Sequence, residues 1–285
     1  MRIARSIADL RAERASGPHQ SIVGFVPTMG ALHDGHISLV RAARTGSDVV
    51  VASIFVNPLQ FGPTEDLASY PRDEVADLVA LRAAGVDIVF LPSVEEMYPE
   101  GASTSIRVDP IGDVLEGAVR PGHFDGVATV VVKLLNIVSP DAAWLGQKDA
   151  QQLAVIRRVV ADLSLPVEIH AAPTVREADG LAMSSRNAYL TPDERIRATA
   201  LYASLRSGAR VLESERNVEA AEKTMLETMV AEGVEADYAA VVDPDDFTPF
   251  RWGQGAALLA IAARIGTTRL IDNVLLPNSR RFAEG

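Results

Sequence analysis

Short apolar runs alternate with segments of helical spacing between residues 22 and 172. The runs, among them Asp48–Val56 and Val86–Leu91, are rich in β-branched residues, which is typical of buried strands. The segments between them, such as Pro71–Ala84 and Ala150–Leu163, have the apolar spacing of a helix face. This alternation predicts an α/β fold, a parallel sheet with helices on both faces. We also expect a short strand at residues 103–108, a loop at 120–126 and a buried helix at 127–138.

A different pattern begins after Pro173. A long polar loop over residues 174–188 is followed by Thr191, Pro192 and Glu194, which read as a capping box with proline at the first helical position. Asn217 is expected to cap a further helix. Strands are predicted over residues 238–242, 256–265 and 269–276, the last two as a hairpin. We therefore predict a domain at 1–174 and a smaller α+β domain at 175–285, with the polar loop at their junction, where binding clefts are common.

Composition and charge exclude several classes of protein. The formal net charge is −11, which argues against a nucleic-acid binder that relies on a broad basic surface. The chain contains no cysteine, so disulfides, cysteine zinc sites and thiol catalysis are excluded. The first residues lack the apolar core of a signal peptide, and the most apolar segment, residues 127–138, is too short to span a bilayer. We expect a cytoplasmic protein that binds neither nucleic acid nor membrane.

The stretch from Gly24 to His36 reads as a buried strand, a glycine-rich turn and the start of a helix. His33 and His36 are three residues apart and share one helix face. A helix N-terminus offers free N–H groups and a positive dipole end, which suit a phosphate. Our interpretation is a nucleotide triphosphate site in which both histidines donate hydrogen bonds. The alternatives are a zinc site, for which no third ligand follows at the usual spacing, and histidines that merely cap the helix.

Three further loops follow predicted strands, around Gln60, Lys148 and Val175, and such loops share the carboxyl edge of a parallel sheet. Lys148 is one of three lysines in the chain and would supply a compact charge to a phosphate, although a solvated turn residue is nearly as good an explanation. The segment Met183–Asn187 offers two hydroxyls and a guanidinium for triphosphate oxygens and could close over the nucleotide, or it could be a plain connector.

Two amides and one carboxylate complete the candidates. Gln60 and Gln152 could fix the hydroxyl and carboxyl groups of a small substrate without adding charge, although a glutamine taken alone is more often a surface residue. Asp77 is a candidate carboxylate on the magnesium side of the site, although a carboxylate on a helix is more often simply solvated.

Five blocks of the chain resemble, in the same order, those of the pantoate–β-alanine ligase family. They are residues 27–36, 55–61, 120–127, 146–152 and 173–187. The first is similar to that family's version of the His-x-Gly-His motif, which nucleotidyltransferases and class I aminoacyl-tRNA synthetases share. The resemblance covers most of residues 20–190, and beyond that it rests on length and domain pattern. The departures are Ala150 in place of a frequent aromatic residue and Gln147 where glutamate is common.

The resemblance implies an enzyme that condenses pantoate with β-alanine at the expense of ATP, through a pantoyl adenylate, with Mg²⁺ and as a homodimer. It also implies that the 1–174 domain is Rossmann-like and binds nucleotide and pantoate, and that the 175–285 domain closes over ATP. The catalytic residues implied are His36 as proton donor, His33, Lys148 and Arg186. The ATP contacts implied are Met29, Gly30, Ala31, Leu32, His33, Asp34, Gly35, His36, Gly146, Gln147, Lys148, Asp149, Val175, Met183, Ser184, Ser185 and Arg186. The substrate contacts implied are Gln60, Gln152, Asn57 and His123.

Two other functions stay open at this point. A nucleotidyltransferase that adenylylates a phosphate substrate would share the histidine loop but would have no use for an amine acceptor. A nucleotide-binding module without catalysis would bind ATP with no turnover.

Overall fold

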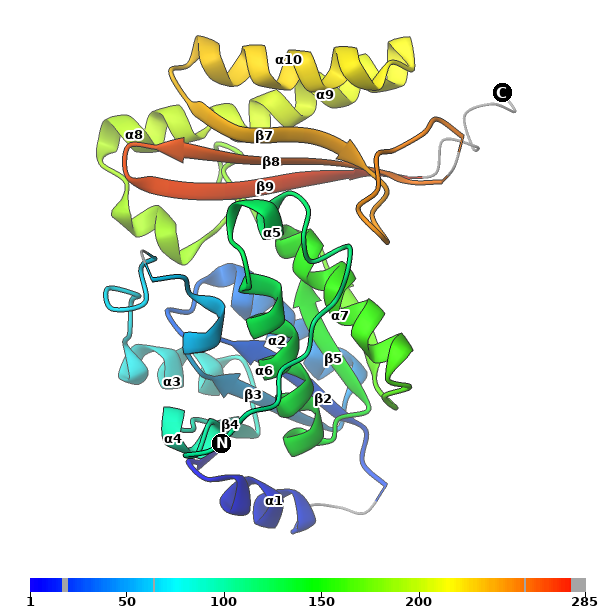
Figure 1. Cartoon of the computed structure of the whole chain (residues 1–285). Coiled ribbons are helices and arrows are strands. Elements are labelled where there is room, and N and C mark those ends of the chain that lie inside the picture. Colours follow the sequence, from blue (N-terminus) through cyan, green and yellow to red (C-terminus); the bar gives the residue numbers. More distant parts are fainter. Residues whose placement is uncertain (17–19, 64, 254, 278–285) are drawn as a thin grey trace. The chain divides into compact units, whose positions relative to one another are not determined.

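The computed structural model describes residues 1–16, 20–63, 65–253 and 255–277 (Figure 1). It divides into two compact units. The first unit comprises Met1–Asp113, Gly117–Gly146 and Val155–Pro173. The second comprises Val114–Glu116, Gln147–Ala154 and the described residues from Thr174 onward. Two short segments that precede residue 174 therefore belong to the unit that the C-terminal part builds.

The first unit contains a parallel sheet, as the alternating pattern predicted. Its described strands lie in the order β1-β4-β3-β2-β5-β6. Their bounds are β1 Arg2–Ala4, β2 Val23–Thr28, β3 Val49–Ile54, β4 Ile88–Phe90, β5 Ala142–Gly146 and β6 Glu168–Ala172. The chain runs outward from β2 to β4 and then returns to place β5 on the other side of β2. This change of direction puts a topological switch point between β2 and β5, which is where such sheets bind ligands.

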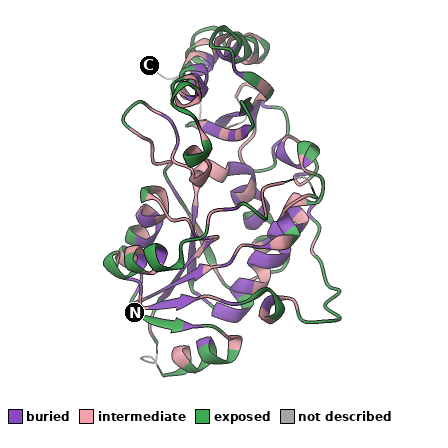
Figure 2. Cartoon of the chain, turned by 90° about the vertical axis from the view of Figure 1, so that its left-hand side faces the viewer, coloured by how far each residue is buried: buried purple, intermediate pink, exposed green. Residues whose placement is uncertain are grey.

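Helices cover both faces of this sheet, as predicted. The helices of this part of the chain are α1 Ile7–Ala15, α2 Asp34–Gly46, α3 Glu74–Ala83, α4 Val94–Met97, α5 Glu116–Val119, α6 His123–Val138 and α7 Ala150–Asp162. The residues of α5 and of α7 are divided between the two units. On one face Leu39 and Val40 of α2 pack with Val26 and Ala52. Neighbouring strand residues such as Phe25 point to the other face, where α1 and α6 contact the strands and each other. Figure 2 shows that the strands are largely buried, as this two-sided cover requires.

The buried helix predicted at residues 127–138 is confirmed, and its single charge has a local explanation. The Lys133 ammonium of α6 donates to the carbonyl of Met97 and lies 5.5 Å from the centre of the Tyr98 ring. At the other end of α6, Gly126 lies so close to a 3₁₀ turn, η1 (Pro58–Gln60), that a Cβ there would be 2.3 Å from the Leu59 carbonyl oxygen. The glycine thus lets α6 pack directly on the turn that carries Gln60.

The second unit is a smaller α+β assembly, as predicted. It contains the 3₁₀ turns η2 Gln147–Asp149 and η3 Ser185–Tyr189, the helices α8 Pro192–Ala198, α9 Ala200–Glu215 and α10 Val218–Ala231, and the antiparallel strands β7 Glu235–Val242, β8 Ala257–Ile265 and β9 Thr268–Leu276. Thr191 and Asn217 cap α8 and α10 as expected. Leu205 and Met225 of the helices pack against Leu259 of the sheet to form the core.

Several local predictions were wrong. Helix α3 begins at Glu74 rather than at Pro71, because the Asp73 side chain caps it by accepting the N–H of Ala76. Residues 103–108 pair with no described strand. Helix α6 starts at His123, inside the expected loop, and β1 was not predicted at all. Among the described residues, no helix is long and apolar enough to cross a membrane.

Candidate active site

The two histidines of the first loop are fixed by their Nδ1 atoms. His33 is the N-cap of α2, and its Nδ1 accepts the N–H of Gly35 at 3.1 Å. The Nδ1 of His36 accepts the N–H of His33 at 3.4 Å, and the two ring centres are 4.1 Å apart. A neutral imidazole whose Nδ1 accepts a hydrogen bond carries its proton on Nε2. Capping and phosphate binding therefore use different nitrogens, and the capping alternative does not compete with the functional one.

The turn before His33 is held by a buried carboxylate. Asp77 of α3 is 4% exposed, and its Oδ2 and Oδ1 accept the N–H groups of Ala31 and Leu32 at 2.9 and 2.8 Å. The N–H of Gly30 donates to Thr28 Oγ1 at 3.2 Å. Burial raises the pKa of the Asp77 carboxyl, and the two backbone hydrogen bonds offset only part of that rise. The N–H groups of Gly30, Ala31 and Leu32 thus have partners within the chain.

Asp77 therefore makes contacts that the sequence did not indicate. Both of its oxygens face the backbone of the histidine loop, not a shared acidic site. Within the described ranges no group of three or more His, Cys, Asp or Glu side chains could hold a metal ion. The place of Asp77 on the magnesium side of the site stays a prediction.

Gln60 lies in a buried group of polar side chains in the first unit. Asn57 and Gln60 are 1% and 8% exposed, and Asn57 Nδ2 donates to Gln60 Oε1 at 3.1 Å. Gln60 Nε2 lies 3.2 Å from the sulfur of Met29. The Tyr98 hydroxyl donates to Asn57 Oδ1 at 2.8 Å, and burial raises the pKa of Tyr98 to about 12, so the hydroxyl stays protonated. Three predicted residues from two loops are thus brought together, with Tyr98 as an unpredicted support.

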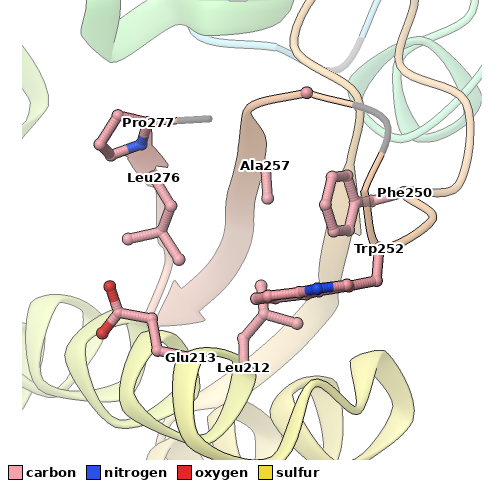
Figure 3. Close-up of a pocket in the computed structure, with 8 residues that line it drawn as sticks. Leu212, Glu213, Phe250, Trp252, Ala257, Leu276 and Pro277 are labelled. Atoms are coloured by element: carbon pink, nitrogen blue, oxygen red, sulfur yellow. The ribbon is translucent and has the colours of Figure 1, made fainter. Parts of the chain in front are cut away.

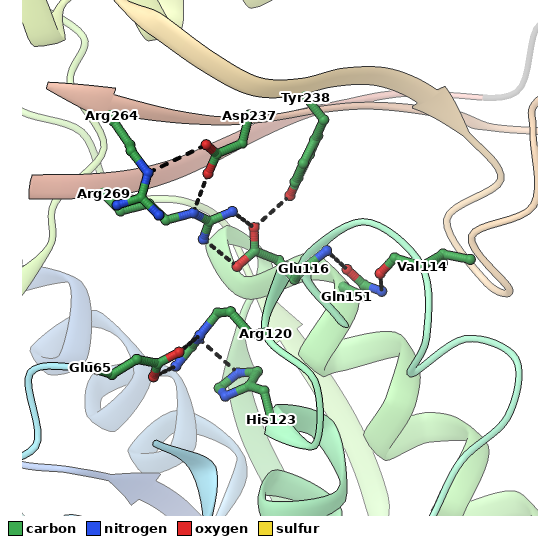
Figure 4. Close-up of polar contacts among 10 residues, drawn as sticks. All are labelled: Glu65, Val114, Glu116, Arg120, His123, Gln151, Asp237, Tyr238, Arg264 and Arg269. Carbon is green, nitrogen blue, oxygen red and sulfur yellow. Dashed lines mark hydrogen bonds and ion pairs between the residues drawn. The ribbon is translucent and has the colours of Figure 1, made fainter. Parts of the chain in front are cut away.

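His123 contacts the backbone of Gln60 and the side chain of Arg120 (Figure 4). Its Nδ1 lies 2.8 Å from the Gln60 carbonyl oxygen, which can only accept, so Nδ1 carries the proton and Nε2 accepts from Arg120 at 3.1 Å. Arg120 also forms two hydrogen bonds with Glu65 at 2.7 and 2.6 Å. Burial acts to raise the pKa of Glu65, but the bonds from Arg120 outweigh it, so the net pKa is lowered. Arg120 stands in one of the resembling blocks, whereas nothing in the sequence signalled Glu65.

In the second unit, the loop that carries Lys148 is tied to β9. Asn273 is 4% exposed, and its Nδ2 donates to the carbonyl oxygens of Gln147 and Lys148 at 3.0 and 2.8 Å. The Gln147 side chain donates back to Asn273 Oδ1 at 3.4 Å. The Lys148 ammonium lies 3.5 Å from Asp149. The sequence analysis missed Asn273, because it lies beyond the blocks that resemble the family.

The loop after β6 also has defined partners. Arg176 forms two hydrogen bonds with Asp272 at 2.6 and 2.9 Å and stacks 3.9 Å from the centre of the Tyr202 ring. Burial raises the pKa of Asp272, and the bonds from Arg176 offset part of that rise. Further along, the N–H of Met183 donates to the carbonyl of Val175 at 3.0 Å. The Ser184 hydroxyl then caps η3 by accepting the N–H of Arg186 at 3.3 Å.

The predicted residues fall into two groups, one in each unit. The first unit holds Met29 to His36, Asn57, Gln60, Asp77, His123 and Gly146, and the second holds Gln147 to Asp149, Gln152, Val175 and Met183 to Arg186. The second unit also has an apolar pocket between Leu212, Phe250, Trp252 and Leu276 (Figure 3). None of the predicted residues lines it.

Comparisons with known proteins place the chain in a family. The family model described as pantoate-beta-alanine ligase matches residues 2–275. This chain belongs to the pantoate–β-alanine ligase family. Among its curated relatives in that family, a pantothenate synthetase of Roseiflexus sp. (strain RS-1) is 55% identical over 278 residues, which are 97% of this chain and 99% of the relative. A pantothenate synthetase of Moorella thermoacetica is 50% identical over 279 residues, 97% of this chain and 99% of the relative.

Solved structures of ligases from this family have the same fold. The crystal structure of a pantothenate synthetase from Thermus thermophilus aligns with a TM-score of 0.91 at 49% identity and covers 96% of this chain and 99% of that one. The ligase of Francisella tularensis, crystallised with beta-gamma ATP and beta-alanine, aligns with a TM-score of 0.81 at 38% identity and covers 96% of this chain and 97% of that one.

Proposed function

We propose that this protein condenses pantoate with β-alanine to form pantothenate and converts ATP to AMP and pyrophosphate. The family match over residues 2–275 carries this proposal. The Francisella tularensis relative, crystallised with an ATP compound and β-alanine, supports two of the three substrates.

In the first half-reaction a carboxylate oxygen of pantoate attacks the α-phosphorus of ATP. The bond from this phosphorus to its bridging oxygen breaks, and pyrophosphate leaves. Negative charge gathers on the leaving group, where positioned donors and cations lower the barrier. We assign this task to the Nε2–H groups of His33 and His36 and to the charges of Lys148 and Arg186. Mg²⁺, when bound, would add positive charge that offsets the repulsion between the carboxylate and the triphosphate.

In the second half-reaction the amine of β-alanine attacks the acyl carbon of pantoyl adenylate. The bond from that carbon to the phosphate oxygen breaks, AMP leaves, and the nitrogen loses a proton. Gln60, Asn57 and His123 are the proposed substrate contacts in the first unit, and Gln152 is the proposed contact in the second. Their uncharged hydrogen-bonding groups suit the hydroxyls and carboxylate of pantoate. The loop around Ser184 and Arg186 would exclude water from the adenylate.

Three wider expectations belong to the same proposal. The residues of 1–174 and 175–285 would act on one ATP molecule, with the C-terminal domain closing over it. The protein would work as a homodimer, as the resemblance implies, and in the cytoplasm, as we expect from the sequence.

The reaction is tested by measuring AMP formation with each substrate omitted in turn. AMP release should require ATP, pantoate and β-alanine together. Transfer of adenylate to a phosphorylated acceptor would support the nucleotidyltransferase alternative instead. ATP binding without any turnover would support a binding module.

The assigned roles are tested with His33→Ala and Lys148→Ala. Each should reduce adenylate formation by ~10²-fold or more, the usual loss when one positioned charge-stabilising donor is removed. Lys223→Ala is the matched control, since its ammonium is exposed and pairs only weakly, 3.7 Å from Glu227 on α10. Rates close to wild type in both site variants would refute the roles.

A further inference from the structure

Asp77 is a buried carboxylate without a cationic partner. It is 4% exposed, and in the described part of the chain no arginine, lysine or histidine forms an ion pair with it. Its hydrogen bonds go to the N–H groups of Ala31 and Leu32, across 46 and 45 positions of sequence. A buried charge is costly to keep in a fold when it is compensated only by neutral donors. A role for this carboxylate in holding the neighbouring loop would account for its place in α3.

The backbone that Asp77 meets has an unusual conformation. Gly30 and Ala31 have φ angles of 80° and 50°, so a residue with a Cβ follows a glycine in the left-handed region. Successive N–H groups in a tight turn can point toward one anion, and here the anion is the Asp77 carboxylate. A Cβ on Gly30 would lie 2.8 Å from Asp77 Oδ2, so only glycine lets the carboxylate approach this closely. The turn and the carboxylate are thus matched in shape and in charge.

The turn leads straight into the histidine pair. Leu32 precedes His33, whose Nδ1 caps α2 and whose N–H donates to His36. A shift of the turn would therefore move both imidazole rings. We propose that Asp77 is a positioning residue of the adenylation step: its carboxylate holds the Gly30–Leu32 turn so that the Nε2–H groups of His33 and His36 face the triphosphate. This inference rests on the proposed function.

The test is Asp77→Asn, assayed separately in the two half-reactions. Asparagine keeps the shape and one acceptor, but it turns the second acceptor into a donor that opposes a backbone N–H. Release of pyrophosphate from ATP with pantoate should fall by ~10–100-fold in kcat, the scale of a small misplacement of catalytic groups. Reaction of preformed pantoyl adenylate with β-alanine involves no triphosphate and should stay within about two-fold of wild type. A general loss of structure would slow both steps equally.

Asp73→Ala is the matched control, because it removes a carboxylate from the same helix. Asp73 caps α3 through the N–H of Ala76 and does not contact the turn. Its loss should lower the melting temperature and leave both half-reactions at wild-type rates. Gly30→Ala disturbs the same contact from the turn, because the added Cβ would lie 2.8 Å from Asp77 Oδ2. It should reproduce the selective loss of adenylation, so the proposal stays testable if Asp77→Asn does not fold.

Two results would overturn the proposal. The first is that Asp77→Asn carries out adenylation as fast as Asp73→Ala does. The second is that, in Asp77→Asn and in Gly30→Ala alike, the rates of both half-reactions fall by the same factor. Failure of the proposed function is a separate result, because wild-type protein would then release no pyrophosphate in response to pantoate.

Discussion

Single side chains in the first unit serve as supports for neighbours that would meet substrate. Tyr98 holds Asn57, Asn57 holds Gln60, and His123 holds the Gln60 carbonyl. Two of these links need a defined protonation state, since the Tyr98 hydroxyl and a His123 ring N–H must donate. Burial enforces that state, because it disfavours the charged form of Tyr98. The position of Gln60 thus depends on its neighbours, among which Tyr98 is not a proposed substrate contact.

Tyr98→Phe should remove a pH dependence of stability at alkaline pH. The pKa of Tyr98 is raised by burial to about 12, so the unfolded chain loses this proton at a lower pH than the folded protein does. Stability from this group is complete below the ordinary tyrosine pKa of about 10 and is lost as the pH rises toward 12, by at most about 1.4 kcal/mol per pH unit. Urea unfolding between pH 8 and about 11.5 would measure it. If the difference between wild type and variant stays constant with pH, the burial argument fails.

At the scale of elements, β9 organises two loops of the second unit. Adjacent residues of this strand take different partners, since Asp272 binds Arg176 after β6 and Asn273 binds the backbone of η2. A strand suits this task because its ladder with β8 fixes the position of each side chain. Both loops are therefore held by contacts from a hairpin far along the chain.

Asn273→Ala should weaken use of ATP more than it weakens the fold. The change leaves the carbonyls of Gln147 and Lys148 without their donor, and each lost buried hydrogen bond costs about 1 kcal/mol or more. We expect kcat/KM for ATP to fall by ~10-fold as the Lys148 loop loosens. Val274→Ala is the control on the same strand, because Val274 packs on the apolar core of the unit. An equal loss of ATP use in both variants would mean that Asn273 supports only the fold.

At the scale of the whole molecule, neither compact unit is a continuous stretch of chain. The second unit takes in Glu116, whose carboxylate binds Arg269 through two hydrogen bonds at 2.7 and 2.6 Å and accepts the Tyr238 hydroxyl at 2.9 Å (Figure 4). Burial acts to lower the pKa of Arg269, but Glu116 and Asp237 outweigh it and raise that pKa. A fragment that begins at residue 174 would lack Glu116 and leave a buried guanidinium with fewer partners.

Glu116→Ala should destabilise the protein strongly. It leaves the Arg269 guanidinium and the Tyr238 hydroxyl without their shared acceptor, and breaking a buried ion pair on one side costs about 3 kcal/mol. The urea midpoint of unfolding is the measurement. Glu13→Ala is the control, because Glu13 pairs with Arg2 where the side chains are 34% and 47% exposed. That surface pair should contribute less than about 1 kcal/mol, and equal shifts of the two midpoints would contradict the argument.

Much of the fold could be read from the sequence because the signals are local. The capping box at Thr191 satisfies its helix end within four residues, and the apolar periods of α6 and α7 persist over several turns. Strand β1 has three residues and carries no period of its own, so only its pairing with β4 makes it a strand. Residues 103–108 show the opposite, because their sequence predicted a strand but they pair with no described strand. There the N–H of Ile106 donates to the Thr129 hydroxyl, and no ladder forms.

The sequence by itself determined the family, the alternation of strands and helices, and the loops that carry His33 and Lys148. Only the tertiary structure decided what holds those loops. Asp77 meets Ala31 across 46 positions, and Asn273 meets Lys148 across 125. A hydrogen bond depends on distance and direction in space, which packing of the core sets, and no local pattern encodes a partner so far away. For this reason the sequence could suggest Asp77 only as a magnesium-side or solvated carboxylate, whereas its place in the fold makes it an acceptor for the histidine loop.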